Sequence, residues 1–192
     1  MDAPRIHQRL VAKFGEKITS AVLEGPTPFV VVATDAIVEV GRFLKEDTEL
    51  AFDNLMNLSA VDWPKETPPR LEVVYHLLSY RHGHTFALKV HLPREEPSVE
   101  TVEGLWAVAN WHEREAFDLF GITFGGHSDL RRILLPDDWS GYPLRKDWVD
   151  PELYNGLRVK PTQQMAERAM VGEQIGVGPF DFTPANRHVE GQ

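Results

Sequence analysis

Five short runs of β-branched and other apolar residues constrain this fold more than any other feature of the sequence. Each run is bounded by glycine, proline or charged residues, and none approaches the roughly 18 residues needed to cross a bilayer. Runs of this length and composition are typical of β-strands. They are KITSAVLEG (17–25), PFVVVAT (28–34), MNLSAVD (56–62), residues 71–80 and residues 85–92. The segment RHGHT between the last two predicts a hairpin turn.

Three segments with apolar residues at helical spacing complete the predicted domain. They cover residues 5–14, 36–44 and 99–120. The first stops at Gly15, the second follows Thr34 and Asp35, either of which can cap a helix, and the third ends at Gly121, a typical left-handed cap. The order of elements predicts an α+β fold with helices packed on a largely antiparallel sheet of about five strands.

The apolar pattern fades after Gly121, where glycine and proline interrupt it. A chain of this kind buries little of its own surface and either lacks order or lies on another protein. We therefore predict an α+β core domain at residues 1–126 and an extended, irregular partner-binding segment and tail at residues 127–192. From about residue 150 the tail should lie extended, with few contacts to residues 1–120.

The lack of cysteine and the acidic charge narrow the chemistry open to the chain. The 192 residues contain no cysteine and carry a formal net charge of -9. Without thiolates the chain can hold neither a disulfide nor a zinc or iron–sulfur site built on cysteine. Net negative charge also disfavours nucleic-acid binding, which needs a basic surface. The N-terminus lacks the apolar core of a secretory signal, which predicts a cytoplasmic protein whose membrane contacts pass through partners.

Ionisable residues are dense among the aromatic residues and glycines of residues 109–148. Glu113 lies there on the apolar stripe of the predicted third helix, and an unpaired charge at such a position is costly. We therefore expect Glu113 to be buried and to accept a hydrogen bond from an arginine or a backbone N–H.

A metal site is one chemical interpretation of the histidines. His82 and His84 would share a strand face in a regular hairpin, with His76 or His91 as a third ligand. A polar turn with solvated imidazoles explains a single H-x-H pair better, because the usual supporting carboxylates are missing nearby.

A hydrolase built on paired carboxylates is a second chemical interpretation. Glu113 or Glu115 would act as the acid and Asp118 or Asp129 as the base, with help from His127. Glu113 and Glu115 are two residues apart and point to different sides of a helix. Structural ion pairs, such as Glu115 with an arginine of LRR (130–132), are therefore favoured.

Anion-binding interpretations of the same region are weaker. The glycines of GITFGGHS (121–128) are not followed by the lysine of a phosphate-binding loop. Basic residues further on alternate with acidic ones, which suits a protein interface better than a nucleic-acid patch. The basic residues are Arg131, Arg132, Arg145 and Lys146, and the acidic ones are Asp129, Asp137, Asp138 and Asp147.

Two adjoining segments closely resemble the signature of one family. EREAFDLFGITFGGHSDLRRIL (113–134) and PDDWSGYPLRKDW (136–148) resemble the signature of the C subunit, or 30 kDa subunit, of proton-pumping NADH:quinone oxidoreductase, respiratory complex I. Weaker upstream elements are similar in kind and order, so the resemblance covers roughly residues 5–150. The sequence departs at Ser128, where the family usually has proline. The signature residues expected at the partner interface are Glu113, Arg114, Glu115, Asp118, His127, Asp129, Arg131, Arg132, Asp137, Asp138, Arg145, Lys146 and Asp147.

The resemblance implies a scaffold rather than a catalyst. It implies a chain without a flavin, an iron–sulfur cluster, a metal or a catalytic residue of its own, within a holoenzyme that uses FMN, iron–sulfur clusters, NADH and quinone. The chain would be a peripheral member of the hydrophilic arm on the cytoplasmic side of the inner membrane. It would pack chiefly against the D subunit and also near the B subunit, where it supports quinone reduction coupled to proton translocation.

Two alternatives remain open at this stage. One is the equivalent subunit of a related membrane-bound hydrogenase or ferredoxin-fed quinone reductase, because its sequence would look similar. The other, from a different class, is a free-standing carboxylate-dependent hydrolase.

Overall fold

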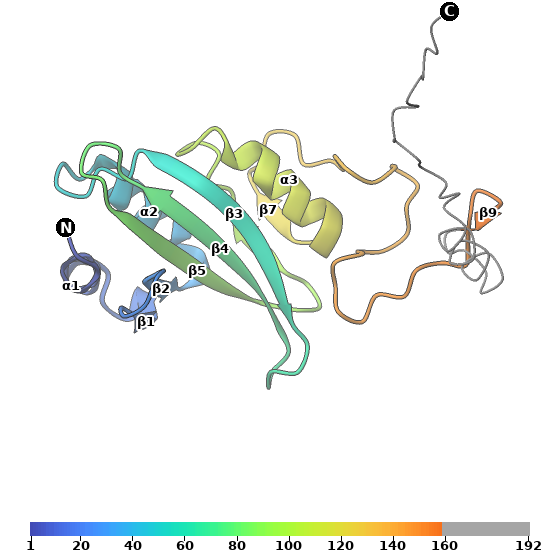
Figure 1. The fold of residues 1–192 in the computed structure, drawn as a ribbon, viewed down its shortest axis with the longest axis horizontal. Helices are drawn as coiled ribbons and strands as arrows, with labels where there is room; N and C mark the ends of the chain where they lie inside the picture. The colour runs from blue at the N-terminus through green and yellow to red at the C-terminus, as the bar shows by residue number, and fades with distance from the viewer. Residues whose placement is uncertain (159–192) are drawn as a thin grey trace, which may run out of the picture. The chain divides into compact units, whose positions relative to one another are not determined.

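A five-stranded mixed sheet forms the centre of the computed structural model, which describes residues 1–158. Its strands are β1 (Ile18–Val22), β2 (Phe29–Val32), β3 (Asn54–Trp63), β4 (Arg70–Leu78) and β5 (Thr85–Pro93). They lie in the order β1-β2-β5-β4-β3, and Figure 1 shows the long strands β3, β4 and β5 side by side. Neighbours are antiparallel except β2 and β5, which run parallel with Phe29 opposite Ala87. The predicted α+β fold and its largely antiparallel sheet are confirmed.

Two amphipathic helices, α1 (Ala3–Phe14) and α2 (Ile37–Glu46), pack on the sheet. α1 begins at Asp2, whose carboxylate accepts a hydrogen bond from the backbone N–H of Arg5. The predicted side-chain cap of α2 is wrong. Thr34–Ala36 form a short 3₁₀ turn, and the Thr34 hydroxyl donates to the backbone carbonyl of His91 instead.

The apolar stripes of these helices and the inner face of the sheet form one core. Buried residues on α1 and α2 meet buried residues on β3, β4 and β5. Removing such side chains from water provides most of the driving force for folding, roughly 1.5 to 3 kcal/mol for each large one. The core includes Ile6, Leu10, Ile37, Val40, Leu44, Leu58, Val73, Tyr75, Leu88 and Val90.

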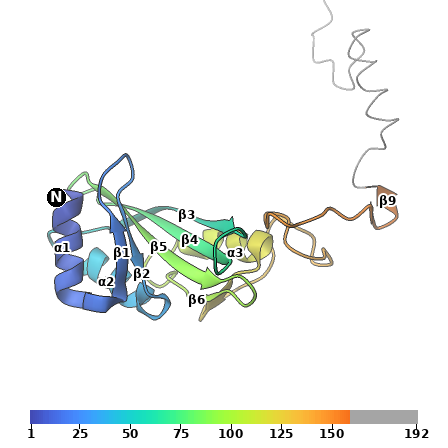
Figure 2. The ribbon, with the colours of Figure 1, turned by 90° about the horizontal axis from the view of Figure 1, so that it is seen from below.

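The third helix, α3 (Ala109–Phe120), is shorter than the predicted helix over residues 99–120. The missing part contains β6 (Ser98–Glu100), which pairs in parallel with β7 (Thr123–Gly125), and a series of turns. Val102 and Trp106 in these turns are buried at the spacing that a helix would have given them. The apolar pattern was therefore right about burial and wrong about the backbone. α3 lies at the opposite end of the sheet from α1 (Figure 1 and Figure 2).

The first compact unit runs from Met1 to Trp148. It includes residues 127–148, which the apolar pattern grouped with the tail. The second unit begins at Val149, and its described part contains the small hairpin of β8 (Leu153–Tyr154) and β9 (Leu157–Arg158). The prediction of an extended tail falls largely on residues 159–192, outside the described residues. No helix within residues 1–158 has the length and apolar character of a membrane span.

Candidate functional site

The signature residues gather around α3 and the chain that follows it. α3 ends at Gly121, which takes the predicted left-handed conformation, and β7 then leads into residues 127–148. This stretch, which we call the signature segment, returns along α3 and contains almost no regular structure. Its backbone N–H and C=O groups therefore need hydrogen-bond partners outside a helix or a sheet. Buried ionisable side chains are many of these partners.

Glu113 lies fully buried on α3, as predicted. One carboxylate oxygen accepts the backbone N–H of Val102 at 2.8 Å, and the other accepts the Thr101 hydroxyl at 2.5 Å. Burial raises the pKa of Glu113 to about 7, although these two hydrogen bonds act in the opposite direction. The prediction that a buried Glu113 accepts a hydrogen bond from an arginine or a backbone N–H is confirmed, through the backbone N–H of Val102.

His127 places its buried ring beside Glu113, with Nε2 3.9 Å from the nearer carboxylate oxygen. Nε2 also lies 3.1 Å from the Asn110 carbonyl, and Nδ1 accepts the backbone N–H of Asp129 at 3.0 Å. This pattern suits the neutral imidazole with its hydrogen on Nε2. Nε2 thus fixes the start of the signature segment against α3, and Nδ1 holds the local turn at Asp129.

Asp118 is the most fully bonded carboxylate near α3. One oxygen accepts the Arg132 guanidinium at 2.7 Å, and the other accepts three consecutive backbone N–H groups, those of residues 133–135, at 2.7–3.1 Å. Burial would raise the pKa of Asp118, but these donors outweigh it and lower the pKa below its usual range. The carboxylate is therefore charged at neutral pH and organises a turn of the signature segment.

Three arginines direct their donors to carbonyl oxygens of the same chain. Arg114 donates to the carbonyls of Arg131 and Arg132, and Arg132 also donates to those of Asp118, Trp139 and Gly141. Arg145 donates to the carbonyl of Phe120, the last residue of α3. Arginines at the C-terminal end of a helix satisfy its free carbonyls and suit its dipole.

Arg94, after β5, joins the far end of the signature segment to the sheet. Its guanidinium binds Asp62 of β3 through two hydrogen bonds of 2.8 and 2.9 Å, and it also binds Asp147. The backbone N–H of Lys146 donates to the same Asp62. The hydrogen bond from Arg94 lowers the pKa of Asp62 and outweighs the opposing effect of burial.

Four residues that support this arrangement were not predicted from the sequence: Asp62, Arg94, Thr101 and Glu103. One signal was available for Asp62, because it occupies an inward position in the alternation that Leu58 and Ala60 set along β3. The other three lie in loops or at a strand end, where no periodicity marks an inward position.

The remaining signature residues face outward. Arg131 is exposed and pairs with its neighbour Asp129 at 3.0 Å. The side chains that are exposed in this group are those of Glu115, Asp129, Arg131, Asp137, Asp138, Lys146 and Asp147. The signature thus divides into a buried set, which shapes the segment, and an outer set, which lies at the surface.

The histidine pair does not form a metal site. His82 and His84 stack on each other with ring centroids 5.5 Å apart, and their Nε2 atoms bind the carbonyls of Thr48 and Leu50. His91 lies with Glu72 on β4 and β5. Among the described residues, no group of three or more His, Asp or Glu side chains is arranged to hold a metal ion.

The positions of these carboxylates do not favour the hydrolase interpretation either. Glu115 is exposed, Glu113 is buried, and Asp118 is fully engaged by Arg132 and backbone donors. A catalytic pair needs two carboxylates within reach of one substrate. The Asp118 carboxylate organises structure instead.

Comparison with known proteins identifies a family and several relatives. The family model described as "Respiratory-chain NADH dehydrogenase, 30 Kd subunit" matches residues 30–152. The C subunit of the NADH-quinone oxidoreductase of Roseiflexus sp. (strain RS-1) is 47% identical over 148 residues, which are 77% of this chain and 84% of that protein.

Two solved structures share the fold. A chain in the structure of the membrane-bound sulfane sulfur reductase, an archaeal respiratory membrane complex, has a TM-score of 0.65 at 29% identity and covers 76% of this chain and 85% of that one. A trypsin-resistant fragment (1–134) of Nqo5 has a TM-score of 0.52 at 31% identity and covers 68% of this chain and all of the fragment.

Proposed function

The chain belongs to the 30 kDa subunit family of the respiratory-chain NADH dehydrogenase, and from this we propose that it is a non-catalytic scaffold subunit of a complex I-type NADH:quinone oxidoreductase. In this role it supports the quinone-reducing module of the hydrophilic arm. Electrons pass from NADH to quinone through other subunits, and the transfer drives proton translocation.

One observation carries the proposal of a non-catalytic role. The most strongly buried ionisable residues of the signature, Glu113, Arg114 and Asp118, have protein partners in the same chain. A catalytic acid, base or nucleophile needs access to a substrate. These three residues instead give the signature segment a fixed shape without regular secondary structure, which suits presentation of a surface to a neighbour.

The outer residues of the signature suit contact with the D subunit and, less extensively, the B subunit. Arg131 and Lys146 provide positive charge, and Asp129 and Asp137 provide negative charge on the same segment. Interleaved charges of both signs give a partner a pattern that fixes orientation and register. Arg132 and Arg145 contribute indirectly, because they hold the backbone that carries these residues.

The cofactors of the holoenzyme, FMN and the iron–sulfur clusters, belong in this proposal to other subunits. Iron–sulfur clusters are held mainly by cysteine thiolates, and this sequence has no cysteine. The same proposal assigns the chain to the cytoplasmic side of the inner membrane, where it is attached through its partners.

The test compares assembly with turnover in membranes that carry Arg131→Ala or Arg145→Ala. For Arg131, losing one charge of a desolvated interfacial pair costs roughly 2 to 5 kcal/mol, enough to reduce the amount of assembled complex markedly. Arg145→Ala should reduce it indirectly, because Arg145 holds the signature segment to the Phe120 carbonyl. Native-gel abundance and NADH:quinone turnover should fall in the same proportion, so that turnover per assembled complex is unchanged. Lys17→Ala, which removes an exposed pair with Glu39, is the matched control and should change neither quantity.

Two outcomes would contradict the proposal. Normal assembly with turnover lost would mean that Arg131 or Arg145 acts on the quinone site itself. Normal assembly with normal turnover in Arg131→Ala would show that Arg131 lies outside the partner interface.

A further inference from the structure

One edge of the sheet, formed by β3, lacks several of the features that usually protect an edge, although β3 has a register irregularity between Leu55 and Asn57. Within residues 1–158, β3 pairs with β4 alone, so the backbone groups on its outer side meet no other strand. Exposed edges are templates for pairing with another chain, and proteins usually blunt them with short strands, lysine or proline. β3 has 10 residues without lysine or proline, and its one charged side chain, Asp62, is buried and bound to Arg94.

The opposite edge of the same sheet is protected. β1 has 5 residues against the 10 of β3, and it follows Lys17 directly. β3 exposes two large apolar side chains, Met56 at 43% and Trp63 at 40% of their full surface, whereas β1 exposes one smaller apolar side chain, Val22. The length of β3 and its two exposed large side chains suit an edge that another chain covers.

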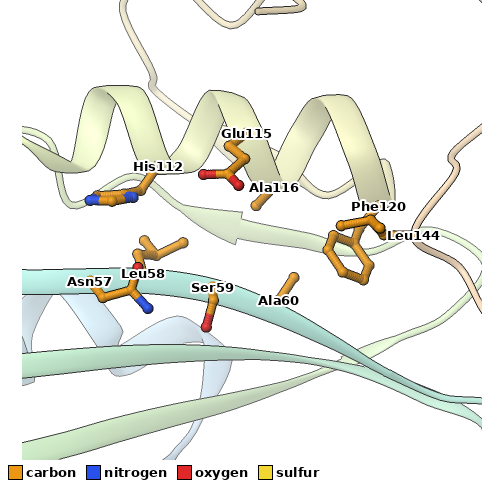
Figure 3. A pocket seen from close by; sticks show the side chains of 9 residues that line it. All are labelled: Asn57, Leu58, Ser59, Ala60, His112, Glu115, Ala116, Phe120 and Leu144. Atoms are coloured by element: carbon orange, nitrogen blue, oxygen red, sulfur yellow. The ribbon is translucent and has the colours of Figure 1, made fainter. Parts of the chain in front are cut away.

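A groove of about 290 Å³ lies between β3 and α3, as Figure 3 shows. Its apolar lining includes Ala116 and Phe120 of α3 and Leu144 of the signature segment. Asn57 of β3 and the α3 residues His112 and Glu115 add polar groups. A strand edge beside a helix, with an apolar groove between them, is the arrangement that binds extended peptides by strand addition.

The polar groups of the groove are available to a ligand. None of the side chains of Asn57, His112 and Glu115 has a hydrogen bond or an ion pair within the described part of the chain. No lysine or arginine lines the groove, so the exposed carboxylate of Glu115 gives it negative charge. A complementary occupant carries a basic side chain at this point.

We propose that β3 and the adjoining face of α3 bind an extended segment of another subunit, which adds a sixth strand along β3. The segment places an apolar side chain over Ala116 and Phe120 and a lysine or arginine next to Glu115. Main-chain hydrogen bonds to β3 supply affinity, and these two side chains supply specificity. The inference rests on the proposed function only in taking the partner to be a subunit of the same complex.

The first test is hydrogen–deuterium exchange of the isolated full chain and of the purified complex that contains it. Alternate backbone amides of β3 should exchange at least about 100-fold more slowly in the complex, because strand pairing makes their opening rare. The amides of β1, at the protected edge, are the internal control and should change far less. Equal exchange of β3 in both samples would overturn the proposal.

A second test uses charge reversal at the groove. Glu115→Lys should weaken rebinding of the chain to a complex depleted of it by about tenfold or more, because a like charge then faces the basic side chain. Glu46→Lys is the matched control, an exposed glutamate at the end of α2 and outside the groove, and should rebind normally. Equal rebinding of the two variants would contradict the predicted charge complementarity.

The occupant is identified by a photo-crosslinker at Asn57 in the purified complex. A crosslink to consecutive residues of another subunit supports strand addition, and a crosslink to residues 159–192, to a second copy or to a helix overturns it. Failure of the chain to co-purify with any complex would refute the proposed function instead, so the two failures are distinguishable.

Discussion

The environment of Glu113 strongly changes the pH at which this residue ionises. Its carboxyl is fully buried, and Nε2 of His127 lies 3.9 Å away, beyond hydrogen-bond distance. Burial therefore raises the pKa of Glu113 from 4.5 to about 7. The unfolded chain deprotonates this group near its ordinary pKa, whereas the folded chain keeps the proton to higher pH.

We predict that Glu113 makes the stability of the chain depend on pH between about 4.5 and 7. Because the folded pKa is raised, its contribution is fully present below the unfolded pKa and is lost as pH rises through 7. The loss is of order 3 kcal/mol, since each pKa unit corresponds to about 1.4 kcal/mol. Urea unfolding of the wild type and Glu113→Gln at pH 4.5 and pH 8 measures it.

The Glu113→Gln variant is the reference for the wild type at both pH values. Glutamine keeps the size and an acceptor for the Val102 N–H but cannot ionise. The free energy of unfolding of the wild type relative to Glu113→Gln should therefore fall from pH 4.5 to pH 8. An unchanged difference would mean that Glu113 titrates as an ordinary exposed carboxyl.

For single residues, the sequence predicted which side chains are buried better than it predicted their hydrogen-bond partners. Glu113 occupies an apolar stripe, so its burial and need for a hydrogen bond followed from helical periodicity. The donors to Asp118 could not be foreseen in this way, because they are backbone groups of residues 133–135 in a segment without periodicity. The bonds of Arg132 to Asp118 and to carbonyls of this chain could not be foreseen either, and its predicted place at a partner interface stays a prediction.

Among the helices and strands, α3 is the one whose end is held most by the chain that follows it. Gly121 ends the helix with a φ of +72°, and a Cβ at this position would lie 2.4 Å from the ring of Tyr142. Arg132 and Arg145 then donate to the carbonyls of Asp118 and Phe120 in the last turn. The end of α3 and the signature segment therefore form one structural unit.

We predict that Gly121→Ala destabilises the chain by roughly 2 to 4 kcal/mol, since a left-handed backbone is strained with a side chain and the added methyl overlaps Tyr142. Gly104→Ala is the matched control, because no atom lies within 4 Å of its added Cβ and its φ is not positive. Thermal and urea unfolding should separate the two variants. Similar stabilities would show that Tyr142 and the turn adjust without cost.

Most elements were predictable because they obey one period for their whole length. β5 alternates buried and half-buried residues over 88–92, and α1 buries Ile6, Leu10 and Phe14 on one stripe. The start of α3 was misplaced because Val102 and Trp106 have helical spacing while their backbone forms turns. The parallel pairing of β2 with β5 joins segments far apart in the chain, and no local pattern encodes it.

Across the first compact unit, Arg94 connects parts that are distant in sequence. It binds Asp62 on the edge strand β3 and Asp147 near the end of the unit. The unit reaches Trp148, and these contacts are one physical reason. Composition alone indicated a loosely packed segment there, because charge pairs between distant residues leave no mark in local composition.

We predict that Arg94→Ala releases the end of the signature segment from the sheet. Without the Arg94 guanidinium, the buried carboxylate of Asp62 still accepts the hydrogen bond from the Lys146 backbone N–H. Asp147 loses its ion pair with Arg94. Losing one partner of a buried pair typically costs roughly 3 to 5 kcal/mol. Hydrogen–deuterium exchange should then accelerate at residues 142–148, and Arg131→Ala, which removes an exposed pair, should leave their exchange unchanged.

Exchange that accelerates uniformly over the whole unit would indicate global destabilisation instead. Unchanged exchange at residues 142–148 in Arg94→Ala would show that Arg145 and Tyr142 suffice to hold the segment. Either result would contradict the role assigned to Arg94.

The pairing of β2 with β5 sets the order in which the sheet can be completed during translation. β1 and β2 leave the ribosome first and can form their hairpin, but the strand that receives β2 ends at Pro93. At about 5 to 20 residues per second, the hairpin therefore waits for several seconds with an unpaired edge and exposed apolar side chains. The nascent chain thus offers chaperones a binding window that closes only when β5 has emerged.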